Sequence, residues 1–68
     1  MDLYALRGHR VRFVFIDGEV IDGYVHTYTS AKDNAPDPES VAIDYPWGNA
    51  GGYLEIAAAE LKEAVILD

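Results

Sequence analysis

The sequence predicts a mainly β fold: a five-stranded, strongly bent antiparallel small barrel with a short N-terminal helix and a 3-10 turn before the last strand. Two β-patterned runs, 10–16 and 19–29, are joined by Asp17 and Gly18. An Asp-Gly pair is typical of a tight two-residue hairpin turn, because Gly adopts positive φ freely and Asp tolerates it. Gly23 lies inside the second run, where a missing side chain indicates a bend, a bulge or the close approach of a neighbouring strand. A long hairpin that bends at such a glycine favours closure of a small sheet.

The length supports one domain, residues 1–68, near the lower size limit for a chain that folds alone. Closing the sheet would leave fewer raw edges, and a chain this small often buries more surface by self-association. The sequence has no cysteine, so a disulfide framework and a thiolate metal site are excluded. Apolar runs fall short of the roughly 20 residues that cross a bilayer, and residues 1–7 do not resemble a signal peptide. We therefore expect a soluble cytoplasmic protein with no membrane contact.

The first strands follow from the alternation of apolar residues. Leu3 to Leu6 predicts one or two helical turns, which Gly8 ends. In the run 10–16, alternate residues share one face, and we assign that face to the core. The inward positions of both runs are Val11, Phe13, Phe15, Ile21, Gly23, Val25 and Thr27, whereas Val20, Asp22, Tyr24, His26 and Tyr28 point outward.

The second half of the chain contains a long loop and three shorter strands. Two prolines and an Asp-Asn pair make 30–39 a loop. The remaining predicted elements are a strand over 40–45 with Val41 and Ile43 inward, a glycine-rich turn over 46–52, a strand over 53–56, a single helical or 3-10 turn within 57–61 and a short strand over 65–67.

The glycines and alternating apolar residues resemble the first half of the motif of Sm-like (LSm) small barrels, within the SH3-like barrel group. The residues that carry this resemblance are Gly8, Val11, Phe13, Phe15, Asp17, Gly18, Ile21, Gly23, Val25 and Tyr28. The segments 54–56 and 60–67 resemble the closing strands of the family. The segment 33–41 is similar to the acidic loop of small Sm-like proteins from Gram-positive bacteria.

The resemblance implies the fold and, in the family, assembly into rings that bind single-stranded RNA. The family's RNA pocket uses an Asp and an Asn after the bend of the second strand, and a basic element near the fourth strand. Here Thr29 stands near the position of that Asp, and 57–59 are three alanines in the region of the basic element. We therefore expect the fold to transfer and the RNA pocket not to.

The charge also disfavours nucleic acid. The net charge is −7, and from Asp33 onward Lys62 is the only basic residue against eight acids. Phosphate backbones attract Lys and Arg, so this balance favours a basic protein partner, with solubility alone as the plain alternative. An RNA-binding surface stays open as the second hypothesis, with a rebuilt pocket formed by Arg10, Arg12, Tyr28 and Lys32.

Aromatic and apolar residues outside the predicted core favour a protein contact or a homo-oligomer. We select Tyr45, Trp47, Tyr24 and Val20 as partner-binding residues, because Tyr and Trp are enriched at interfaces and outward valines are unusual in water. For Trp47 the alternative is a loop aromatic that folds over the end of the barrel.

We predict no catalytic residues, metal, cofactor or small-molecule substrate. His9 and His26 lie on neighbouring strands with Asp22 or Asp44 nearby, but outward polar residues explain them as well as a metal site does. Four oxygen-bearing residues of the loop, Asp33, Asn34, Asp37 and Glu39, do not have the spacing of an EF-hand. We therefore interpret the chain as a non-enzymatic interaction module.

Overall fold

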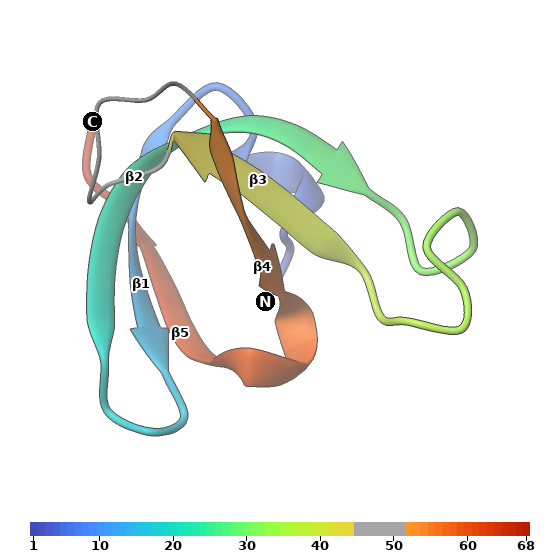
Figure 1. The fold of residues 1–68 in the computed structure, drawn as a ribbon. Coiled ribbons are helices and arrows are strands. Elements are labelled where there is room, and N and C mark those ends of the chain that lie inside the picture. The colour runs from blue at the N-terminus through green and yellow to red at the C-terminus, as the bar shows by residue number, and fades with distance from the viewer. Residues whose placement is uncertain (45–51) are drawn as a thin grey trace.

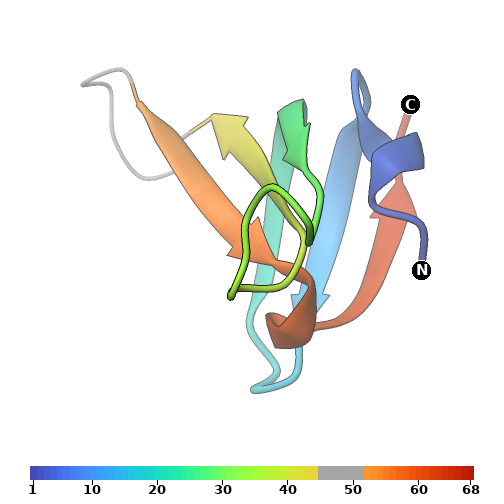
Figure 2. The ribbon, with the colours of Figure 1, turned by 90° about the vertical axis from the view of Figure 1, so that its right-hand side faces the viewer.

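A computed structural model describes residues 1–44 and 52–68 of this chain, as one antiparallel sheet with two short helices. The elements in chain order are η1 (Tyr4–Leu6), β1 (Arg10–Phe15), β2 (Val20–Thr29), β3 (Ser40–Asp44), β4 (Tyr53–Ala57), η2 (Ala58–Glu60) and β5 (Leu61–Ile66). Across the sheet the order is β4-β3-β2-β1-β5, which the side view in Figure 2 shows from left to right. The predicted five antiparallel strands, the N-terminal helix and the 3-10 turn before the last strand are confirmed.

The β1–β2 hairpin has a three-residue loop, so the predicted two-residue turn is wrong. Phe15 and Glu19 close the loop: the Phe15 N–H donates to the Glu19 carbonyl at 2.8 Å, and the Gly18 N–H donates back to the Phe15 carbonyl at 2.9 Å. Gly18 has a φ of 93°, and no described residue other than glycine has positive φ. A three-residue loop with glycine at its last position needs only one left-handed residue, so Asp17 keeps an ordinary backbone. The Asp17 side chain instead accepts a hydrogen bond from the Glu19 N–H at 2.9 Å.

β2 is the long strand shared by the two halves of the sheet, and it bends as predicted (Figure 1). Its first half pairs with β1, with Gly23 opposite Val11, and its second half pairs with β3. An ideal Cβ on Gly23 would lie 2.6 Å from Ile43 Cδ1, so the missing side chain makes room for β3. Close packing of a neighbouring strand is therefore the reason for this glycine.

A bulge in β2 changes which side chains face the core. The register shifts between Val25, opposite Ile43, and Thr27, opposite Ala42. An extra residue in one strand reverses the alternation beyond it. Thr27 is consequently exposed, whereas Tyr28 packs against the core, so the predicted orientations of these two residues are wrong.

The core lies on the concave side of the sheet and under η1. Phe13, Val25 and Ile43 are fully buried, and Leu3 and Leu6 of the N-terminal segment close one side. The other members of this cluster are Val11, Ile21, Val41, Ile56 and Leu61. The inward assignments of Val11, Phe13, Ile21, Val25, Val41 and Ile43 are thus confirmed.

The sheet is open within the described residues. β4 pairs with β3 alone and β5 with β1 alone, and η2 links the two edge strands at one end of the molecule. β5 begins at Leu61, four residues before the predicted start, because Phe15, Val14 and Phe13 pair with Leu61, Glu63 and Ala64. Residues 62–64, two charged residues and one alanine, concealed this start because they show no apolar alternation.

The loop 30–39 extends away from the sheet in Figure 1 and is organised by its own polar groups. The Asn34 side-chain amide donates to the Pro38 carbonyl at 2.8 Å, and the Asp33 N–H donates to the Ser30 hydroxyl at 3.2 Å. These are the turn-forming roles expected of Asn and Ser. Neither helix in the described part of the chain has the length and apolar character to cross a membrane.

Candidate interaction surface

The convex face of the sheet carries the polar and aromatic side chains that the strands turn away from the core. Tyr24 lies opposite Arg10, Asp22 opposite Arg12, and Val20 opposite Val14. Arg12 and Val14 have Val65 and Glu63 as their partners on β5. This face thus combines exposed aliphatic, aromatic and charged groups in neighbouring rows.

An ion pair holds the centre of this face. Arg12 Nε donates to Asp22 Oδ1 at 2.8 Å, and Arg12 Nη2 donates to Asp22 Oδ2 at 3.0 Å. The hydrogen bond and charge of Arg12 lower the pKa of the Asp22 carboxyl, to which Arg10 adds a weaker attraction. Both side chains are partly open to water, so this pair fixes geometry more than it stabilises the fold.

The Arg12→Gln substitution is expected to raise the pKa of Asp22 toward the ordinary value of about 3.9. In the native chain the folded-state pKa lies below the unfolded value. The pair therefore stabilises the fold above about pH 4 and loses this contribution as the pH falls through the folded pKa. An NMR titration of the side-chain carboxyl carbons measures the shift. Arg10→Gln is the matched control and should raise the pKa of Asp22 by less; an equal rise in the two variants would contradict the assignment to Arg12.

A second cluster lies on the same face over β2, β3 and β4, and we call Tyr24, His26, Asp44 and Tyr53 the aromatic platform. The His26 ring centroid is 4.8 Å from that of Tyr24 and 5.2 Å from that of Tyr53, with interplanar angles of 70° and 72°. His26 Nε2 lies 2.6 Å from Asp44 Oδ1. Because an ionised carboxylate only accepts hydrogen bonds, Nε2 is the donor and holds the ring in place.

The structure describes two of the four residues that we predicted to bind a partner. Tyr24 and Val20 lie on the convex face of β2, with exposed fractions of 37% and 53%. Tyr45 and Trp47 lie outside the described residues. Sequence reasoning did not select Tyr53 as a contact residue, although its alternation with the inward Leu54 and Ile56 indicates an outward side chain. The register that puts Asp44 opposite Tyr53 gave no signal in the sequence.

The four residues named for RNA do not form one surface. Arg12 is held by Asp22, whereas Tyr28 packs edge-to-face on Tyr4 with ring centroids 5.4 Å apart. Burial raises the pKa of the Tyr28 hydroxyl, and the negative charge of Glu39 raises it further. Lys32 lies in the projecting loop, far along the chain from Arg10 on β1. The structure therefore brings together Arg10 and Arg12 only.

The two histidines have separate carboxylate partners. His9 Nδ1 lies 2.9 Å from Asp68 Oδ1, and Asp68 Oδ2 accepts from the Arg10 N–H at 3.3 Å. These contacts lower the pKa of the Asp68 carboxyl, with the His9 hydrogen bond as the largest cause. In the described residues, no group of three or more His, Asp or Glu side chains is placed to hold a metal ion. The contact of His9 instead ties the last residue to the start of β1.

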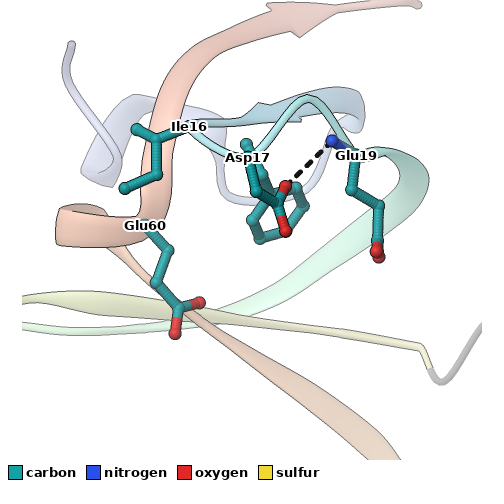
Figure 3. A pocket seen from close by; sticks show the side chains of 5 residues that line it. Ile16, Asp17, Glu19 and Glu60 are labelled. Atoms are coloured by element: carbon teal, nitrogen blue, oxygen red, sulfur yellow. Dashed lines mark hydrogen bonds between the residues drawn. The ribbon is translucent and has the colours of Figure 1, made fainter.

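An open depression of about 380 Å³ lies at the tip of the β1–β2 hairpin. Its lining combines the apolar Phe15 and Ile16 with the acidic Asp17, Glu19 and Glu60 (Figure 3). The Ile16 N–H donates to the Glu60 carbonyl at 3.0 Å and joins the hairpin to η2. The Asp17 carboxylate is used by the turn, so this depression is a structural junction of the sheet.

Comparisons of this chain with protein-family models, with curated proteins and with solved structures found no match.

Proposed function

We propose that this chain is a non-enzymatic Sm-like small-barrel module that self-associates and binds a protein partner. The strand order β4-β3-β2-β1-β5, the bend of β2 at Gly23 and the short helix η2 before the last strand support the Sm-like assignment. The excess of acidic residues supports a partner with a basic surface.

The observation that carries the proposal is the apolar edge of the sheet at β5. Val65, Ile66 and Leu67 are consecutive and have exposed fractions of 43%, 43% and 42%. Ile66 lies opposite the buried Val11 and is still exposed, because among residues 1–44 and 52–68 β5 pairs with β1 alone. An edge strand with exposed aliphatic residues is a template for pairing with another chain.

The β4 edge of the sheet can pair with the β5 edge of another copy. β4 is the other end of the sheet, and Tyr53 on it has an exposed fraction of 66%. Pairing of β4 from one copy with β5 from the next joins two different surfaces, and such a head-to-tail contact leads to a ring or a filament. We propose a cytoplasmic homo-oligomer of this kind.

The Val65→Lys substitution is expected to raise the concentration at which oligomers form by about 10-fold, because a lysine on an edge strand opposes strand pairing. Size-exclusion chromatography with light scattering over a concentration series measures the change. Val20→Lys is the matched control, since it adds the same charge to an exposed valine of a central strand, and should shift this concentration by less than about 2-fold.

Two results would contradict the proposed edge contact. A native chain that stays at its monomer mass of 7.5 kDa up to about millimolar concentration would remove self-association. Disruption by Val20→Lys and not by Val65→Lys would move the contact from the β5 edge to the part of the convex face over β2.

A further inference from the structure

We propose that the aromatic platform binds an arginine side chain of a basic protein partner. This inference rests on the proposed function, because it assigns the partner-binding site of the interaction module. It concerns side chains on the convex face over β2, β3 and β4, whereas the self-association contact proposed above pairs the backbone edges of β4 and β5. Tyr53 on the edge strand β4 lies close to both.

The geometry of the platform suits a flat cation. Tyr24 and Tyr53 each make an edge-to-face contact with the His26 ring. The exposed fraction is 37% for Tyr24 and 66% for Tyr53, so water reaches their rings. A guanidinium stacks on such faces through its charge and its plane, and it gives up less hydration than an ammonium does.

The carboxylate of Asp44 supplies the acceptors of the platform. Oδ1 lies against Nε2 of His26, and the second oxygen has a further lone pair to offer. The side chain of Asp44 is 65% exposed, which leaves this oxygen accessible. Arginine has five N–H donors and no acceptor, so its hydrogen-bonding character complements this set.

The charge around the platform has the sign that the occupant needs. Glu55 follows Tyr53 on the same face of β4, and the chain as a whole carries a net charge of −7. Arg10 lies on the β1 side of Tyr24, where Asp22 and the carboxylate of Asp68 are its acidic neighbours. Among the described residues, the side of the platform toward β3 and β4 is therefore the acidic one.

The test uses a fluorescein-labelled Gly-Ser peptide with three arginines, and the same peptide with citrulline, which has the shape of arginine without its charge. Fluorescence anisotropy at about 50 mM salt is expected to show binding of the arginine peptide and at least about 10-fold weaker binding of the citrulline peptide. Tyr53→Ala and Tyr24→Ala should each weaken binding of the arginine peptide by about 3-fold, which corresponds to the loss of one exposed cation–π contact. Tyr53→Phe keeps the ring and should bind within about 2-fold of the native chain.

The carboxylate has a charge-matched control. Asp44→Asn should weaken binding by about 3- to 10-fold, whereas Glu63→Gln, which removes one negative charge from the same face at β5, should change it by less than about 2-fold. Backbone amide spectra of each variant check that the fold is intact. Equal losses for Asp44→Asn and Glu63→Gln, or unchanged binding by both tyrosine variants, would overturn the site.

The same measurement on the Val65→Lys chain separates this site from self-association. If the Val65→Lys chain no longer forms oligomers but still binds the arginine peptide, the platform is a site independent of self-association. If the native chain forms oligomers but does not bind the peptide, the platform is overturned as a site while the proposed self-associating module stands. Labelled oligo-U is measured in parallel. Tighter binding of oligo-U than of the arginine peptide, lost in Tyr53→Ala, would assign the platform to RNA and overturn the proposal.

Discussion

The Gly23→Ala substitution is expected to lower the free energy of unfolding by about 1–3 kcal/mol, the usual cost of overpacking a filled core. The new Cβ would lie 2.6 Å from Ile43 Cδ1 and 3.2 Å from Ile43 Cβ. The Cδ1 methyl group of Ile43 can rotate away from the new Cβ. The Cβ atom of Ile43 is fixed to the backbone of β3, so β2 and β3 must move apart. Alanine is better than glycine in a strand by about 0.5–1 kcal/mol, which offsets only part of this cost. Thermal unfolding should show the loss at about 4–8 °C for each kcal/mol.

A shorter side chain at Ile43 tests whether its contact with the new Cβ causes this loss of stability. Ile43→Val alone removes Cδ1 and should cost about 0.5–1.5 kcal/mol. With Gly23→Ala in the same chain, the two costs should sum to more than the measured loss, because the valine removes the closest clash. If the losses in free energy of unfolding from the two substitutions add strictly, Gly23 is required for a reason other than its contact with Ile43.

The Phe13→Ala substitution is expected to have the largest effect, about 3–5 kcal/mol. Phe13 is fully buried in the middle of β1, between Ile21 on β2 and Ala64 on β5. A domain of this size has little stability to spare, so much of the chain should be unfolded at 37 °C. Urea denaturation followed by circular dichroism measures the loss.

Val20→Ala is the control for Phe13→Ala, because Val20 is an exposed residue of the adjacent strand. It should cost less than about 1 kcal/mol. A similar cost for both substitutions would mean that the concave face is not the core.

The strands and the core were predictable because both depend on short-range alternation. Val11, Phe13, Val41 and Ile43 alternate with polar or small residues, and this period of two identifies the buried face without knowledge of the partners. The bulge beyond Val25 was not predictable, since it depends on how β3 packs against β2. The early start of β5 at Leu61 depends in the same way on its pairing with β1. Both errors come from contacts between distant segments.

The candidate site was predictable only as separate residues. Tyr24 was selected as a partner-binding residue, and His26 and Asp44 were considered for a metal, because their residue types carry chemistry. Their assembly with Tyr53 requires the β3–β4 register, which places Asp44 opposite Tyr53 and has no signal in the sequence. The RNA hypothesis failed at Tyr28 for a related reason. Its aromatic ring could stack on a base, but the bulge in β2 turns it toward Tyr4.

The position of β1 between β2 and β5 has a consequence for the order of folding. The hairpin with β2 joins neighbours in sequence, whereas the ladder with β5 joins segments far apart in sequence. The Leu67 N–H, which donates to the Arg10 carbonyl, and the contact of Asp68 with His9 reinforce this ladder. Pairings between distant segments form slowly, because a long loop must close first. A chain still being synthesised can form the β1–β2 hairpin, but it cannot cover the open flank of β1 until residues 61–66 have been made.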